Sequence, residues 1–148
     1  KLKKTARYGV ACFLYITGLL HAIARIRLRR KAVVLMYHRV LSDEEYLTCF
    51  SMNGIVVTTK TFAKQMKYLA RNFHIVSPED FLKHMQEKMP FASKTCLVTF
   101  DDGWKDNFKN ALPTLKENKV PALVFLATGF IDTRNYFWQT RLIRSLYS

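Results

Sequence analysis

Hydrophobic positions after residue 31 alternate between a strand-like and a helical spacing. A continuous apolar run at 32–37, rich in branched side chains, predicts a strand buried on both faces. Apolar side chains recur at helical spacing in 61–72 and predict an amphipathic helix. The elements expected after it are strands at 74–76, 95–100 and 121–127, and helices from 78 to before 90, at 106–118 and at 136–146. Strands and helices in this order predict an α/β fold with a mostly parallel sheet.

Proline and capping residues set the expected limits of these helices. Ser77 and Pro78 are typical of a helix start, because serine caps free backbone N–H groups and proline is accepted in the first turn. Pro113 lacks a backbone N–H and is expected to bend or break the helix that contains it. Residues 41–58 are expected to form a long loop that approaches the functional site.

The first 31 residues differ from the remainder in hydropathy and in charge. An apolar run at 8–24 lies between two basic clusters and predicts a hydrophobic N-terminal helix. Such a helix is about 25 Å long, slightly less than the roughly 30 Å of a bilayer's hydrocarbon core. We therefore divide the chain into this basic-flanked helix at 1–31, a candidate membrane anchor, and a domain at 32–148.

Three interpretations of the apolar run remain open. The tripeptide Ala22-Ile23-Ala24 resembles the cleavage site of a signal peptide, but the basic cluster at 25–31 opposes translocation. A signal anchor or an interfacial helix, with arginines on anionic headgroups, agrees better with these flanks. The third interpretation is a helix packed against the domain. We favour association with a membrane surface, on a side that the balanced flanking charges do not decide.

The distribution of charge supports the same division of the chain. The formal net charge of +13 comes from 24 basic and 11 acidic side chains. Nine of the basic and none of the acidic ones lie in 1–31, so the domain carries only 15 basic against 11 acidic residues. A nucleic-acid-binding domain spreads basic residues over its own surface, and we therefore expect no nucleic-acid partner. The three cysteines lack the spacing of a disulfide scaffold or a zinc finger.

Two adjacent carboxylates end the third predicted strand of the domain. The segment 99–103 reads Thr-Phe-Asp-Asp-Gly, with Asp101 and Asp102 at the carboxyl end of a buried strand. Buried carboxylates are costly unless they are hydrogen-bonded, paired or bound to a metal. Successive side chains of a strand point to opposite faces, so one carboxylate suits a metal ligand and the other a general base. A solvated turn at Gly103 is the alternative, and the flanking strand and helix favour the functional interpretation.

His38 follows the first predicted strand of the domain and therefore lies at the same kind of edge. Functional sites of parallel α/β folds form at the carboxyl ends of the strands. A single histidine is most often a structural residue, but the edge that it shares with Asp101 and Asp102 supports a role in or beside the site. No histidine has a second one three to five residues away, so the sequence does not contain a complete metal site.

Three segments of the domain together resemble the polysaccharide deacetylases, the NodB-homology group or carbohydrate esterase family four. These segments are 34–40, 99–103 and 121–127, within a likeness that spans 31–143. The resemblance implies the N-terminal part of a distorted (β/α) barrel. It also implies metal-dependent hydrolysis of N-acetyl groups on a sugar polymer or a lipid-linked glycan.

The same resemblance assigns roles to three residues. Asp101 would be the general base, Asp102 a ligand of a divalent metal, usually zinc, and His38 a neighbour of the site on the substrate side. The family's remaining ligands come from a later H-x-x-x-H pair that this chain lacks, and zinc sites normally need three protein ligands. We therefore expect part of a deacetylase, associated with a membrane or cell envelope, that is inactive alone. The alternative is a catalytically degenerate, membrane-associated protein that binds glycan or a partner protein.

Overall fold

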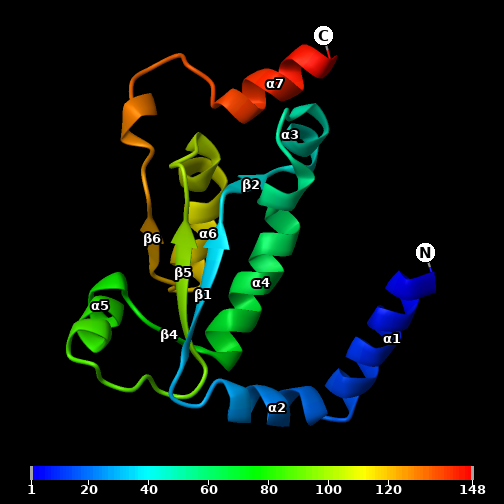
Figure 1. Ribbon diagram of the computed structural model, residues 1–148, viewed down its shortest axis with the longest axis vertical. Coiled ribbons are helices and arrows are strands. Elements are labelled where there is room, and N and C mark those ends of the chain that lie inside the picture. Colours follow the sequence, from blue (N-terminus) through cyan, green and yellow to red (C-terminus); the bar gives the residue numbers. More distant parts are fainter. Residues whose placement is uncertain (1, 148) are drawn as a thin grey trace.

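The computed structural model describes residues 2–147 and contains a four-stranded sheet built around β5 (Thr95–Phe100) (Figure 1). Strand β1 (Ala32–Tyr37) pairs with β5 along its whole length. The other edge of β5 is shared, because β4 (His74–Ile75) pairs with its first residues and β6 (Ala122–Val124) with its last. All these pairings are parallel, which confirms the α/β fold predicted from the sequence.

A second sheet, of two strands, begins directly after β1 in the chain. Strand β2 (Arg39–Leu41) begins after the single residue His38 and pairs in parallel with β3 (Val56–Thr58). The segment between them was expected to be a loop, but it contains helix α3 (Asp43–Thr48) and the short 3-10 helix η1 (Asn53–Ile55).

A capping box explains why α3 forms in this segment. The backbone N–H of Glu45 donates to Ser42 Oγ at 3.1 Å, and the backbone N–H of Ser42 donates to Glu45 Oε2 at 2.9 Å. Two N–H groups that a helix start leaves free are satisfied in this way. This Ser-x-x-Glu spacing is present in the sequence and is a signal for a helix start at Ser42.

Helix α4 (Thr59–Asn72) covers one face of the main sheet. Its apolar residues Phe62, Met66 and Leu69 recur at helical spacing and are buried, as predicted. They form one hydrophobic core with residues of β2, β5 and the segment that follows β5, namely Val40, Cys96, Val98, Phe100, Ala111, Leu115 and Val120. This core fixes the strands whose carboxyl ends carry the candidate site residues.

The remaining helices lie close to their expected positions. Helix α5 (Pro78–Gln86) begins with a Ser77 cap and ends before Pro90, as predicted. The helix expected to be bent or broken at Pro113 is a π-helical turn, η2 (Asn107–Ala111), followed by α6 (Leu112–Glu117). A 3-10 turn, η3 (Thr128–Phe130), precedes the last helix, α7 (Trp138–Tyr147).

Part of the sheet's other face is exposed. All six residues of β5 are buried, but Val34 and Met36 of β1 are 50% and 61% exposed. The prediction that this strand is buried on both faces is therefore wrong. With Leu82 of α5 and Phe125 after β6, they line an apolar cavity of about 600 Å³. Within residues 2–147 the strands form an open sheet, and the barrel stays a prediction.

Two helices replace the single hydrophobic helix expected near the N-terminus. Helix α1 (Leu2–Ile16) and helix α2 (Leu19–Arg27) meet at an angle of 84°. The break falls at Gly18, whose φ of 73° is left-handed and incompatible with a continuous helix. Neither helix has the length and hydropathy to cross a membrane alone, whereas the bent pair together meets those two criteria. Figure 1 shows α1 projecting away from the sheet.

Candidate active site

The carboxyl ends of β1 and β5 bring His38 and Asp101 together. The last residues of the two strands, Tyr37 and Phe100, lie opposite each other, and the Asp101 backbone N–H donates to the Tyr37 carbonyl oxygen at 2.9 Å. His38 Nε2 lies 3.9 Å from Asp101 Oδ2, which is longer than a hydrogen bond. Both side chains are partly exposed, 23% for His38 and 29% for Asp101. A water molecule or a substrate can therefore reach the pair.

The turn after β5 directs the two carboxylates to different partners. Asp102 and Gly103 both have left-handed backbone conformations, with φ of 70° and 67°. Aspartate tolerates this conformation better than most residues, and glycine has no side chain to oppose it. Asp102 Oδ2 accepts a hydrogen bond from Trp104 Nε1 at 3.1 Å, whereas Asp101 faces His38. The two acids have separate environments, as two separate roles require.

Asp102 lies at the border of two cavities. On one side it lines the apolar cavity under β1 and β6 together with Asp101. On the other side it lines a smaller cavity of about 200 Å³ with His38, Trp104 and Phe137. The carboxylates and His38 thus have access to hollows with aromatic and aliphatic walls, the usual composition of a small-molecule site.

A buried ion pair between Asp106 and Arg39 fixes the part of the chain that follows His38. Asp106 is only 5% exposed, and its Oδ2 accepts hydrogen bonds from Arg39 Nε at 3.1 Å and Nη2 at 2.9 Å. Its other oxygen, Oδ1, accepts from the Val40 backbone N–H at 2.8 Å. Asn107 Nδ2 donates to the His38 carbonyl oxygen at 2.8 Å. The segment after Asp102 therefore fixes the backbone that follows His38.

Tyr37 supports the site from within the core. Its ring contacts Phe62 edge-on and stacks on Phe100, and its hydroxyl donates to Gln65 Oε1 at 3.0 Å. Burial raises the pKa of Tyr37 to about 12, with a smaller contribution from Cys96. Tyr37 is therefore uncharged at neutral pH. Its packing holds the end of β1 in place, directly before His38.

Known proteins are similar to this chain in sequence and in fold. A family model described as polysaccharide deacetylase matches residues 88–147. YxkH of Bacillus subtilis (strain 168), provisionally named a polysaccharide deacetylase, is 31% identical over 114 residues, which are 76% of this chain and 37% of that protein. The poly-beta-1,6-N-acetyl-D-glucosamine N-deacetylase of Staphylococcus epidermidis is 28% identical over 116 residues, 73% of this chain and 40% of that protein. The structure of IcaB from Ammonifex degensii matches with a TM-score of 0.59 and 27% identity, over 77% of this chain and 48% of that one.

The chain belongs to the polysaccharide deacetylase family. The mixed α/β architecture with a parallel sheet is shared with the solved deacetylase structures. The chain spans about two fifths of the length of the curated relatives that it matches.

The donor atoms near Asp102 do not by themselves form the metal centre expected of a deacetylase. Among the residues that the structure describes, no three His, Cys, Asp or Glu side chains gather in a way that could hold a metal ion. Zinc sites normally use at least three protein ligands. Asp101, Asp102 and His38 thus supply at most part of such a ligand set.

Sequence reasoning located the candidate acids of this deacetylase-family chain but missed the residues that support them. Neither Arg39 nor Asp106 was identified from the sequence as a supporting residue, although Asp106 is buried and the two are ion-paired. Asn107 was also missed. One available signal was the position of Asp106 and Asn107 in the first turn after the acidic pair, where their side chains can reach a neighbouring strand end.

Proposed function

We propose that this protein deacetylates a polysaccharide of N-acetylated amino sugars, with Asp101 as the general base. The observation that carries the proposal is the partly exposed Asp101 carboxylate beside His38 at the end of two paired strands, in a chain of the deacetylase family. The S. epidermidis relative is named for poly-beta-1,6-N-acetyl-D-glucosamine. We take β-1,6-linked N-acetylglucosamine oligomers as the first substrate to test.

The proposed reaction is hydrolysis of an acetamide. A water oxygen attacks the acetyl carbonyl carbon, the carbon–nitrogen bond breaks, and acetate and a free amine are released. Asp101 accepts a proton from the attacking water, a role that suits a carboxylate open to solvent, and the leaving nitrogen takes up a proton as the carbon–nitrogen bond breaks. His38, 3.9 Å from that carboxylate, lies on the substrate side and orients the acetamide or the water.

We propose that Asp102 contributes one ligand to a divalent metal, usually zinc in this family. Its Oδ2 is oriented by Trp104 Nε1, as ligating carboxylates commonly are by a neighbouring donor. Because the described residues do not complete a metal centre, the remaining ligands would lie outside them.

In the intact protein, Asp102→Asn should lower zinc affinity at least about tenfold, measured by calorimetry, whereas Asp101→Asn should lower it less.

We also propose that the sheet is one part of a larger (β/α) barrel. The support is the apolar face of β1, where Val34 and Met36 remain half exposed or more beside Leu82 and Phe125. Exposed apolar surface of this kind is normally covered in a folded protein. In a barrel, these side chains would face the interior and would lie beneath the acidic pair.

Residues 1–31 form the proposed contact with a membrane surface. On α2, Leu19, Ile23 and Ile26 lie on one face and are each at least 40% exposed, while Arg25 lies on the opposite face. An apolar face combined with arginines suits the boundary of an anionic bilayer. The substrate would then be a glycan of the cell envelope or a lipid-linked sugar.

Vesicle sedimentation tests this contact. The intact protein should bind vesicles that contain phosphatidylglycerol more strongly than vesicles of phosphatidylcholine alone. Ile26→Glu should reduce this binding, whereas Ile131→Glu, an exposed isoleucine outside the arm, should leave it unchanged. Equal effects of both substitutions would refute the proposed contact.

Acetate release from β-1,6-linked N-acetylglucosamine oligomers tests the catalytic proposal. Asp101→Asn should lower the rate at least about 100-fold, the usual contribution of a general base. Asp132→Asn is the control, because Asp132 is an exposed aspartate that lies outside the candidate site. Both variants are made in the intact protein. If the intact wild-type protein binds the oligomer without releasing acetate, the catalytically degenerate glycan-binding protein is the correct interpretation.

A further inference from the structure

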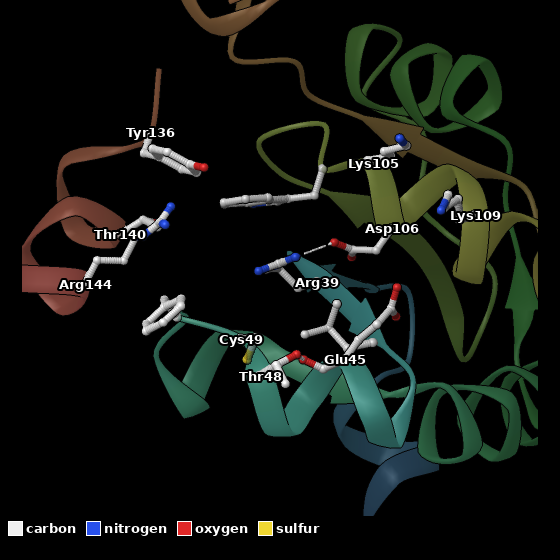
Figure 2. A pocket seen from close by; sticks show the side chains of 13 residues that line it. Arg39, Glu45, Thr48, Cys49, Lys105, Asp106, Lys109, Tyr136, Thr140 and Arg144 are labelled. Carbon is white, nitrogen blue, oxygen red and sulfur yellow. Dashed lines mark hydrogen bonds and ion pairs between the residues drawn. The ribbon is translucent and has the colours of Figure 1, made fainter. Parts of the chain in front are cut away.

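A second cavity lies beside the candidate active site. It has a volume of about 370 Å³ and is enclosed by α3, the start of β2, the segment after Gly103 and the last helix α7 (Figure 2). Phe50, Trp104 and Thr140 line both this cavity and the smaller one that contains His38 and Asp102. The two hollows are therefore neighbours, and this cavity is close enough to the acidic pair to receive a part of a sugar chain bound there.

Both carboxylates of this cavity already have hydrogen-bond donors. Asp106 is hydrogen-bonded to Arg39 through one oxygen and to the Val40 backbone N–H through the other. Glu45 Oε2 accepts hydrogen bonds from the Ser42 backbone N–H at 2.9 Å and from Asn110 Nδ2 at 2.7 Å. The Ser42 bond is the main reason why the pKa of Glu45 is lowered, so this carboxylate is ionised and engaged at neutral pH.

The positive charges of the cavity are in excess. The lining contains two carboxylates, those of Glu45 and Asp106. It contains four basic side chains, those of Arg39, Lys105, Lys109 and Arg144. Among the described residues, no carboxylate lies within ion-pair distance of Lys105, Lys109 or Arg144. Apart from the paired Arg39, one guanidinium and two ammonium groups therefore line the hollow with a single further carboxylate, that of Glu45, whose pKa Lys109 helps to lower.

Aromatic rings hold the guanidinium of Arg144 in place. Its central carbon lies 4.6 Å from the centre of the Tyr136 ring and 5.4 Å from that of Phe50. Figure 2 shows Tyr136, Thr140 and Arg144 on the side of the cavity opposite Arg39 and Asp106. Stacking on aromatic rings leaves the N–H groups at the edge of a guanidinium free to bind an anion in two places at once.

We infer that this cavity binds an anionic substituent, a carboxylate or a phosphate group, carried by the glycan next to the sugar that is deacetylated. The inference rests on the proposed function and makes it more specific, because an uncharged N-acetylglucosamine polymer has no anionic group with which Arg144 could pair. A guanidinium suits both carboxylate and phosphate oxygens, and a cavity of this size is within the range of small-ligand sites.

Binding of small amino sugars to the intact protein tests the inference. The probes are N-acetylglucosamine, N-acetylglucosamine 6-phosphate and N-acetylmuramic acid, which are neutral, phosphorylated and carboxylated. Trp104 lines the cavity and the chain has one other tryptophan, the exposed Trp138. In a Trp138→Phe background, tryptophan fluorescence therefore reports on the cavity. At low salt, at least one anionic probe should bind roughly three- to tenfold more tightly than the neutral one.

Two variants on α7 give a matched comparison. Arg144→Gln should remove the preference for the anionic probe, and Arg144→Lys should keep part of it. Arg141→Gln, one turn earlier on the same helix and outside the cavity lining, should keep all of it. The double variant Arg25→Gln/Arg27→Gln should also keep it, which separates the cavity from the basic arm.

The outcomes that overturn the inference are specific. Equal affinities of the wild-type protein for all three probes would do so, as would an equal loss in Arg141→Gln and Arg144→Gln. Asp101→Asn should abolish acetate release and retain the anionic preference. Acetate release without any anionic preference would refute this inference and leave the proposed function intact.

Discussion

One carboxylate oxygen of Asp106 binds the guanidinium of Arg39 twice, although 67 residues separate the two in the sequence. The pair is buried, with side-chain exposures of 18% for Arg39 and 6% for Asp106. Asp106→Ala should therefore leave a buried cation without a partner and lower the free energy of unfolding by about 3–5 kcal/mol. Urea denaturation followed by circular dichroism measures this loss.

The control for this prediction is an ion pair on the surface. Asp43 pairs with Lys60, and both side chains are largely exposed. Solvent and salt screen such a pair, so Asp43→Ala should change the unfolding free energy far less than Asp106→Ala. Similar losses in the two variants would show that burial does not strengthen the Arg39–Asp106 pair.

Gly103 is predicted to be intolerant of any side chain. Its φ of 67° is left-handed, and a Cβ at this position would lie 2.5 Å from Leu126 Cδ2. The exposed Leu126 side chain can move away, so the strained backbone accounts for most of the expected loss of about 1–2 kcal/mol in Gly103→Ala. Acetate release should fall as well, because the turn orients Asp101 and Asp102.

Gly129→Ala is the matched control for Gly103→Ala. Nothing lies within 4 Å of a Cβ at Gly129, and no left-handed φ is found there. Both stability and acetate release should therefore remain close to those of the wild-type protein. If Gly103→Ala is equally harmless, the turn after β5 does not constrain the acidic pair.

The buried phenol of Tyr37 predicts a loss of stability in alkali. Its pKa in the folded protein is about 12, against an ordinary value near 10. Between these values the unfolded chain loses the phenolic proton while the folded protein keeps it. This part of the stability is therefore complete below pH 10 and is lost as the pH rises toward 12.

Comparison with Tyr37→Phe isolates this effect. The unfolding free energy of the wild-type protein should fall more steeply with pH above 10 than that of the variant. Absorbance at 295 nm should show one late-titrating tyrosine in the folded wild-type protein that is absent from Tyr37→Phe. Parallel stability curves for the two proteins would contradict the prediction.

Cys96 is predicted to resist thiol reagents in the folded protein. Burial raises its pKa to about 11, so the reactive thiolate is scarce at pH 8. Cys12 is exposed and Cys49 half-buried. A chromogenic disulfide reagent should therefore modify two thiols in the native protein and a third only after guanidinium is added. Cys96→Ala should give two in both conditions, and three rapidly reacting thiols in the native wild type would contradict the prediction.

The sequence was sufficient to predict the elements whose hydrophobic runs end at polar residues. The bounds of β1 and β5 were predicted correctly, because His38 and Asp101 end the two apolar runs. A parallel sheet then implied that these two residues lie at the same edge, and the pairing of β1 with β5 brings them to 3.9 Å. In such cases local patterns and one topological rule determine the geometry.

Contacts between distant segments were not predictable in this way. The Arg39–Asp106 pair depends on how η2 packs against β2, which no periodicity encodes. The exposure of Val34 and Met36 depends on what covers the sheet, because a run of apolar residues is the same whether one face is covered or two. The break at Gly18 was missed because hydropathy alone does not report backbone conformation.

The arrangement of strands around β5 has a consequence for how the protein is made. Strands β1 and β4 are both synthesised before β5, yet each pairs within the main sheet with β5 alone. Both therefore lack their partner strand until residues 95–100 have left the ribosome. Nascent chains paused before this point should be prone to aggregation or dependent on chaperones. Rapid translation through 74–100 would shorten this vulnerable interval.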